Sequence, residues 1–159
     1  AITAQNSSFN NGNATRTYEY DERGNITHIL LNDNGQFHTY YTYDKLNRLI
    51  REDNQKLDKT TVYFYDANGN ISSKQTCDYK AKEYHPNIRD LPLGDPINYY
   101  YSNSWKDVLT GYGSQGNIVY SNSNGYPSNY RGKPMTWDRG NLTSTADNYY
   151  TYRVDNLVL

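Results

Sequence analysis

The sequence lacks several features that stabilise small proteins or direct them to a partner. Its single cysteine, Cys77, cannot form a disulfide within the chain, which excludes a disulfide-stapled scaffold. No apolar run approaches the roughly 18–20 residues that a membrane span needs. No signal peptide opens the chain, so an export signal would lie outside this segment. The net charge is only −1, from 16 basic and 17 acidic residues. This balance gives no electrostatic footprint for nucleic acid and no basis for membrane insertion.

Aliphatic side chains are also scarce. Hydrophobic residues make up 35% of the chain, and 19 of them are tyrosines. A helical bundle needs long stripes of Leu, Ile and Ala, whereas Tyr, Thr, Val and Ile favour strands, and Asn and Gly favour turns. The mean hydropathy of −1.02 is that of many disordered chains, but those are poor in aromatics and rich in net charge. With 15% aromatic residues, this composition predicts an ordered all-β protein.

Three blocks repeat along the first half of the chain: YEYDERGNI from Tyr18, YTYDKLNRLI from Tyr41 and YFYDANGNI from Tyr63. Their first tyrosines stand at positions 18, 41 and 63, a spacing of 23 and then 22 residues. A near-constant period with one signature indicates a repeat architecture. The signature residues are Tyr18, Tyr20, Asp21 and Gly24; Tyr41, Tyr43, Asp44 and Asn47; and Tyr63, Tyr65, Asp66 and Gly69.

The residue types of each block predict a strand, a tight turn and a returning strand. Two tyrosines spaced two residues apart project from the same face of a strand. The aspartate that follows can accept backbone N–H bonds at the start of a turn. Three residues later, Gly or Asn suits the left-handed conformation that closes a type I turn with a G1 bulge. We expect an antiparallel meander in which the tyrosine pairs stack from hairpin to hairpin into an aromatic ladder.

The pattern divides residues 1–159 into regular repeats (17–76), an inserted loop (about 77–96) and less regular repeats (97–159). In the last part, Ser102 follows Tyr99-Tyr100-Tyr101 where aspartate is expected, and Trp137-Asp138 replaces Tyr-Asp. The final block, from Tyr150, stops within its returning strand, which indicates a fragment of a longer repeat protein. The predicted fold is all-β: antiparallel β-hairpin repeats forming a curved continuous sheet.

These blocks resemble the signature of the RHS/YD-repeat family, Y-x-Y-D-x-x-G-[RN]-[LI], over most of the chain outside residues 77–96. The resemblance implies a segment of a β-shell in a secreted or cell-wall-associated bacterial protein. It implies a structural function, in which the shell encloses or displays a toxin or effector domain. The partners would then be the rest of the parent protein and its enclosed domain. Asp90 to Pro96 shares an Asp-Pro pair with the family's protease-like core but lacks the surrounding arginines and glycines, so no cleavage is assigned to it.

The sequence offers no convincing catalytic, metal or cofactor site. His28, His38 and His85 lack the spacing of metal ligands, although His28 and His38 are expected to face each other across a hairpin. The serines lack a nucleophile elbow and a histidine partner, and nothing near Cys77 activates a thiolate. Asp66 to Asn70 has its glycine at the fourth position, which fits a hairpin turn better than a calcium loop. The chain is therefore predicted not to be an enzyme.

Two further hypotheses concern binding. Tyr and Trp rings stack on sugars, so the aromatic repeat face is also consistent with a carbohydrate-binding adhesion module for cell-wall or host glycans. Trp105 and Trp137 are the candidate glycan-binding residues, because they lie outside the regular tyrosine pairs. Unpaired edge strands invite pairing, which predicts self-association through the open sheet edges.

Overall fold

The prediction of an all-β fold is confirmed. The structure is a computed structural model that describes residues 6–8, 14–104, 106–113, 118–120, 125–130 and 132–152, with the backbone alone for 6–8 and 118–120. Antiparallel strands dominate the described residues, whose one helical segment is the 3-10 turn Ile88–Asp90. No helix among them is long and apolar enough to cross a membrane. The chain divides into two compact units, residues 1–65 with 73–96, and residues 66–72 with 97–159.

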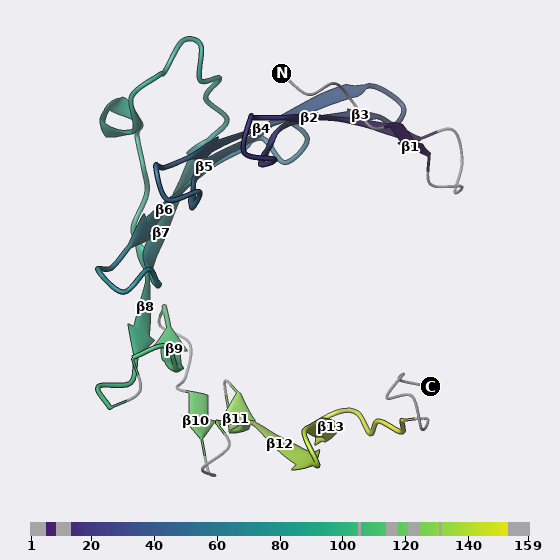
Figure 1. Cartoon of the computed structure of the whole chain (residues 1–159), viewed down its shortest axis with the longest axis vertical. Helices are drawn as coiled ribbons and strands as arrows, with labels where there is room; N and C mark the ends of the chain where they lie inside the picture. The colour runs from purple at the N-terminus through teal and green to yellow at the C-terminus, as the bar shows by residue number, and fades with distance from the viewer. Residues whose placement is uncertain are drawn as a thin grey trace. The chain divides into compact units, whose positions relative to one another are not determined.

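The first unit is a meander in which each strand pairs with the next along the chain (Figure 1). Its strands are β1 (Asn6–Ser8), β2 (Thr15–Tyr20), β3 (Ile26–Asn32), β4 (Gln36–Tyr43), β5 (Leu49–Asn54), β6 (Lys59–Tyr65) and most of β7 (Ile71–Asp78). Short turns join consecutive strands, as expected where neighbours in sequence become neighbours in a sheet. Because β7 runs to Asp78, the connection to the next strand covers residues 79–96.

The second unit continues the antiparallel pattern with shorter strands. They are β8 (Ile97–Tyr101), β9 (Leu109–Tyr112), β10 (Ile118–Tyr120), β11 (Pro127–Tyr130), β12 (Lys133–Asp138) and β13 (Asn141–Thr145). β8 pairs with β9, and β10 to β13 pair in chain order. Trp137-Asp138 ends β12 at the turn into β13, the place that Tyr-Asp takes in the regular repeats.

A register shift recurs at the end of the strand that leads into a signature turn. It falls between Glu19 and Tyr20, between Thr42 and Tyr43, between Tyr100 and Tyr101, and between Thr136 and Trp137. In each case the aromatic residue that directly precedes the turn, Tyr20, Tyr43, Tyr101 or Trp137, follows the shift. A bulge bends the strand and re-aims the side chain beside it. The bulge therefore gives this aromatic residue an orientation that a regular strand would not.

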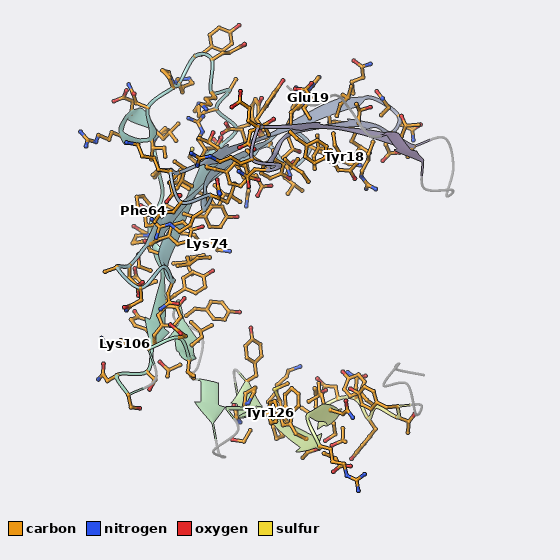
Figure 2. All side chains as sticks on the ribbon, in the orientation of Figure 1. Tyr18, Glu19, Phe64, Lys74, Lys106 and Tyr126 are labelled. Atoms are coloured by element: carbon orange, nitrogen blue, oxygen red, sulfur yellow. The ribbon has the colours of Figure 1, made fainter. Side chains whose placement is uncertain are left out.

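The sheet of the first unit has two chemically different faces. Tyr18 lies opposite Ile29 on β3, which in turn lies opposite Thr39 on β4. In the same way Tyr41 lies opposite Glu52 on β5, which lies opposite Thr61 on β6. Side chains opposite each other in register share a face, so the signature tyrosines of β2, β4 and β6 share one, here called the tyrosine face. The other, the histidine face, carries Glu19, His28, His38, Tyr40, Arg51, Asp53, Thr60, Val62 and Phe64. Figure 2 shows Tyr18 on the inner side of the bend in this sheet and Glu19 on the outer side.

Burial is concentrated on one part of the histidine face. Among the described residues, the side chains with less than 2% exposure are Arg51, Asp53, Thr60 and Val62, all on β5 and β6. Residues 79–96 lie on the outer side of the bend beside these strands (Figure 1). The only other buried hydrophobic residue of the described chain is Leu91, within that segment. The inserted loop therefore supplies the cover under which the small core of this unit forms.

Candidate functional site

Each signature aspartate organises the turn that follows it, and Asp21 shows how. Its Oδ1 accepts hydrogen bonds from the backbone N–H groups of Arg23 (2.9 Å) and Asn25 (2.8 Å). The Asn25 side chain donates to Oδ2 at 2.9 Å. Gly24 N–H donates to the Asp21 carbonyl at 3.1 Å, and Gly24 has a φ of 84°, in the left-handed region that glycine adopts without strain. The carboxylate thus satisfies backbone donors that the tight turn would otherwise leave open.

The same arrangement recurs at Asp44 and Asp66. Asp44 Oδ1 accepts from the amides of Leu46 and Arg48, and Asp66 Oδ1 accepts from those of Asn68 and Asn70. The left-handed position is filled by Asn47 (φ 61°) and Gly69 (φ 92°). The repeated signature therefore produces a repeated turn geometry.

Hydrogen bonding lowers the pKa of all three signature aspartates below the ordinary value of 3.8. At Asp21 the main cause is the side chain of Asn25, and at Asp44 it is the backbone amide of Arg48. At Asp66 loss of hydration acts in the opposite direction, but hydrogen bonds from Asn70 and Asn68 outweigh it. A carboxylate that accepts several N–H bonds is stabilised in its charged form. These groups are therefore held ionised as structural acceptors.

The second tyrosine of a block reaches back to the main chain of the preceding repeat. The Tyr43 hydroxyl donates to the Ile26 carbonyl at 2.9 Å, and the Tyr65 hydroxyl donates to the Leu49 carbonyl at 2.6 Å. The other two bonds of this kind are Tyr101 to Ile71 (2.9 Å) and Tyr152 to Leu142 (2.7 Å). In each case the acceptor lies at the start of the preceding returning strand. We call this contact the tyrosine latch; sequence reasoning predicted a packed ring at these positions and missed the hydrogen bond.

Trp137 makes the same contact with a different donor. Its indole N–H donates to the Pro127 carbonyl, at the start of β11, at 2.6 Å. Its ring stacks on Tyr126, with ring centroids 5.0 Å apart and an interplanar angle of 16°. Trp137 therefore takes the latch position of its repeat, and the glycan-binding role expected for it stays a prediction. The other candidate, Trp105, lies outside the described residues.

The expected ladder of stacked tyrosine pairs differs from the observed arrangement. The returning strands β3 and β5 lie between the tyrosine-bearing strands β2, β4 and β6. The backbones of successive tyrosine strands are thus two strand spacings apart, roughly 9.5 Å. At Tyr65 the ring instead meets Arg48 of the preceding signature turn, whose guanidinium lies 4.5 Å from the ring centroid.

A buried polar cluster attaches the inserted loop to the histidine face. Arg51 Nε donates to Asp53 Oδ1 at 2.9 Å, and both side chains are 1% exposed. The remaining nitrogens of the Arg51 guanidinium donate to the carbonyls of His85 (2.6 Å) and Lys80 (2.7 Å). Thr60 donates to Asp53 Oδ1 at 2.7 Å and accepts from the backbone N–H of Lys80 at 2.9 Å. One side chain therefore holds both ends of the turn at residues 81–84.

His28 and His38 face each other across the β3–β4 hairpin, as predicted. His28 Nε2 and His38 Nδ1 are 2.9 Å apart, and their rings are within 5° of parallel. His28 Nδ1 lies 3.1 Å from Glu19 Oε1 on β2. The Tyr40 ring stacks on His28, with centroids 4.5 Å apart. The described residues contain no group of three or more His, Cys, Asp or Glu side chains that could hold a metal ion.

A pocket of about 710 Å³ lies between this histidine cluster and the inserted loop. Its lining includes His38, Tyr40 and Gln55 from the sheet region, and Tyr79, Lys82 and Glu83 from the loop. The volume falls within the range of about 300–1,000 Å³ that is common for ligand sites. Sequence reasoning missed this pocket, because its walls depend on where a loop of irregular composition packs against the sheet.

No known family model matches this chain, and no curated protein matches it.

Proposed function

We propose that the chain is a structural repeat segment of a large secreted or cell-surface protein, where it forms part of a wall that encloses or displays a toxin or effector domain. The observation that supports this best is the tyrosine latch. In the described part of the chain it joins four blocks to the backbone of the preceding repeat, at Tyr43, Tyr65, Tyr101 and Tyr152. Contacts of this kind extend a sheet indefinitely by adding repeats.

The distribution of burial also favours a wall. In the first unit the strands form a single layer, and buried side chains occur where the loop covers β5 and β6. Such a layer gains its stability from neighbouring repeats more than from a central core. Its two faces differ in chemistry, and the tyrosine face lies on the inner side of the bend (Figure 2). A wall with a lumen on one side requires this kind of asymmetry.

The proposal is tested by labelling the two faces of one strand in the full-length parent protein. In a Cys77→Ser background, Lys59→Cys places a thiol on the tyrosine face of β6, and Phe64→Cys places one on the histidine face. Both positions are exposed in this chain. A bulky PEG-maleimide should label both thiols in the isolated segment but only Phe64→Cys in the intact parent. Equal labelling of both thiols in the intact parent would contradict the wall.

A second candidate is the carbohydrate-binding adhesion module. The observation in its favour is the aromatic pair of Tyr126 and Trp137, because the faces of Tyr and Trp rings pack on sugars. A Trp fluorescence titration against cell-wall polysaccharides and a glycan panel tests it. Saturable binding that Trp105→Ala or Trp137→Ala abolishes would support this candidate, and no response across the panel would reject it.

A further inference from the structure

The pocket on the histidine face has walls that are fixed before any ligand arrives. On the loop side, Arg51 holds the carbonyls of Lys80 and His85, so the turn between them has little freedom to move. Within that turn, the N–H groups of Tyr84 and His85 both donate to the Ala81 carbonyl. On the sheet side, the backbone N–H of His38 donates to the Gln55 side chain at 3.0 Å. Binding loses less conformational entropy when the site is already ordered.

The sheet side of the pocket presents flat rings. Tyr40 is 38% exposed, so part of its ring remains open although it stacks on His28. The bond between His28 and His38 holds the two imidazoles nearly coplanar, and Glu19 fixes the far nitrogen of His28. Across the pocket, the loop contributes Tyr79. The aromatic groups thus form a platform whose orientation is set by hydrogen bonds outside the pocket.

The polar groups of the pocket are of both signs. The loop supplies one cation, Lys82, and one anion, Glu83, and Gln55 adds an amide. The opposite charges offset each other, so no net field favours a charged ligand. Together the groups offer both donors and acceptors around an aromatic platform. A pyranose ring matches this set, because its C–H face packs on aromatic rings while its hydroxyls donate and accept at the rim.

From this geometry we infer that the inserted loop and the histidine face form a binding site for an uncharged oligosaccharide. Most of its lining belongs to the histidine face and the loop, although Tyr41 of the tyrosine face also reaches it, and Trp137 does not line it. The scaffold function does not depend on this site. The segment 79–96 then has a role of its own: it makes a binding surface on the outer side of a repeat sheet.

The test is titration calorimetry of the full 159-residue chain with the tetramers of N-acetylglucosamine, glucose in β-1,4 linkage and glucose in α-1,4 linkage, with heparin as an anionic comparison. At least one neutral tetramer should bind saturably. Tyr40→Ala and Lys82→Ala should each weaken that binding at least tenfold. Leu57→Ala is the control, because Leu57 belongs to the neighbouring β5–β6 turn but is 65% exposed and outside the pocket lining, and it should leave the affinity unchanged.

Circular dichroism melting of each variant separates loss of the site from loss of the fold. Binding that persists in Tyr40→Ala and Lys82→Ala but disappears in Trp137→Ala would overturn this site in favour of the Trp platform. Absence of binding to every tetramer by the folded wild-type chain would also overturn it. Binding of heparin alone would contradict the argument from charge. None of these outcomes bears on the wall, which the labelling of Lys59→Cys and Phe64→Cys tests independently.

Discussion

Replacing Arg51 by methionine should destabilise the first unit strongly and release the inserted loop. Arg51 is 1% exposed, and its guanidinium makes hydrogen bonds to Asp53, Lys80 and His85. Methionine keeps most of the side-chain volume but removes the charge and all three donors. Asp53 would then be a buried carboxylate that keeps the hydrogen bond from Thr60 and has no compensating cation.

The expected cost follows from the charge that is left behind. Removing one partner of a buried ion pair costs about 3–5 kcal/mol, because the other charge remains desolvated without compensation. Domains are typically stable by only about 5–15 kcal/mol, so this loss is a large fraction of the total. At about 2–4 °C per kcal/mol for a chain of this size, the melting temperature should fall by roughly 6–20 °C.

Two comparison variants isolate the effect of burial. Arg48→Met removes a guanidinium that also pairs with an aspartate, at 2.7 Å, but whose side chain is 30% exposed. A half-exposed pair of this kind contributes about 0–1 kcal/mol. The cation–π contact of Arg48 with Tyr65 adds about 0.5–1 kcal/mol, so this variant should lose clearly less stability than Arg51→Met. The double variant Arg51→Met/Asp53→Leu removes both buried charges and should recover much of the loss, since an apolar pair of similar volume often substitutes well.

Urea unfolding followed by circular dichroism gives the free energies, and limited trypsin cleavage after Lys80 and Lys82 reports release of the loop. Cleavage should be much faster in Arg51→Met than in Arg48→Met. If the two single variants lose the same stability, or if the loop is equally resistant in both, the argument that Arg51 clamps the loop by a buried charge network is wrong.

Three further predictions concern individual groups. Tyr43→Phe removes the latch to Ile26 and should cost about 1 kcal/mol of unfolding free energy. Tyr41→Phe is the control and should cost under about 0.5 kcal/mol, because the Tyr41 hydroxyl has no hydrogen-bond partner among the described residues. Equal losses in the two variants would show that the latch does not stabilise the fold. The pKa of Asp44 is lowered from 3.8 in the folded state, so its contribution to stability is complete above that value and is lost as the pH falls through the lower folded pKa. Between pH 5 and 2, the melting temperature of Asp44→Asn should therefore fall less steeply than that of the wild type. Parallel curves for the two proteins would contradict this. Burial raises the pKa of the Cys77 thiol above its ordinary value of 9.0, so Cys77 should react with a disulfide reagent at pH 8 more slowly than free cysteine, and an equal rate would show the thiol to be open.

The all-β fold class, the repeat and the tight turns could be predicted from the sequence, because they depend on interactions between residues close together in the chain. Asp44 followed by Asn47 specifies a tight turn whatever surrounds it, and the observed φ of 61° at Asn47 is a local consequence of that turn. Counting back from the short turn after Asn32 places Leu30 opposite His38 and His28 opposite Tyr40, so the two histidines lie on one face as diagonal neighbours. In each case the relevant partners lie within about ten residues, where sequence spacing fixes geometry.

The buried cluster and the latch could not be predicted for a different reason. Arg51-Glu52-Asp53-Asn54 is among the most polar stretches of the chain, yet Arg51 and Asp53 are almost fully buried. The segment that covers them, residues 79–96, lies some thirty residues further along the chain, and its position on the sheet depends on tertiary packing. At Tyr43 the latch follows a bulge that re-aims the side chain, whereas the spacing of Tyr-x-Tyr alone indicates only a shared face.

The acceptor of the latch has a consequence for how such a chain can change over time. Every latch ends on a main-chain carbonyl, at positions as different as Ile26, Leu49 and Pro127. A carbonyl oxygen is present whatever amino acid occupies the position, so mutation of the acceptor's side chain leaves the bond available. The donor is less constrained than it first appears, since an indole N–H serves as well as a phenol. Repeats joined by such latches can be duplicated, deleted or exchanged between genes without a matching change in the adjacent repeat. Their sequences can diverge while the hydrogen bond between them is kept.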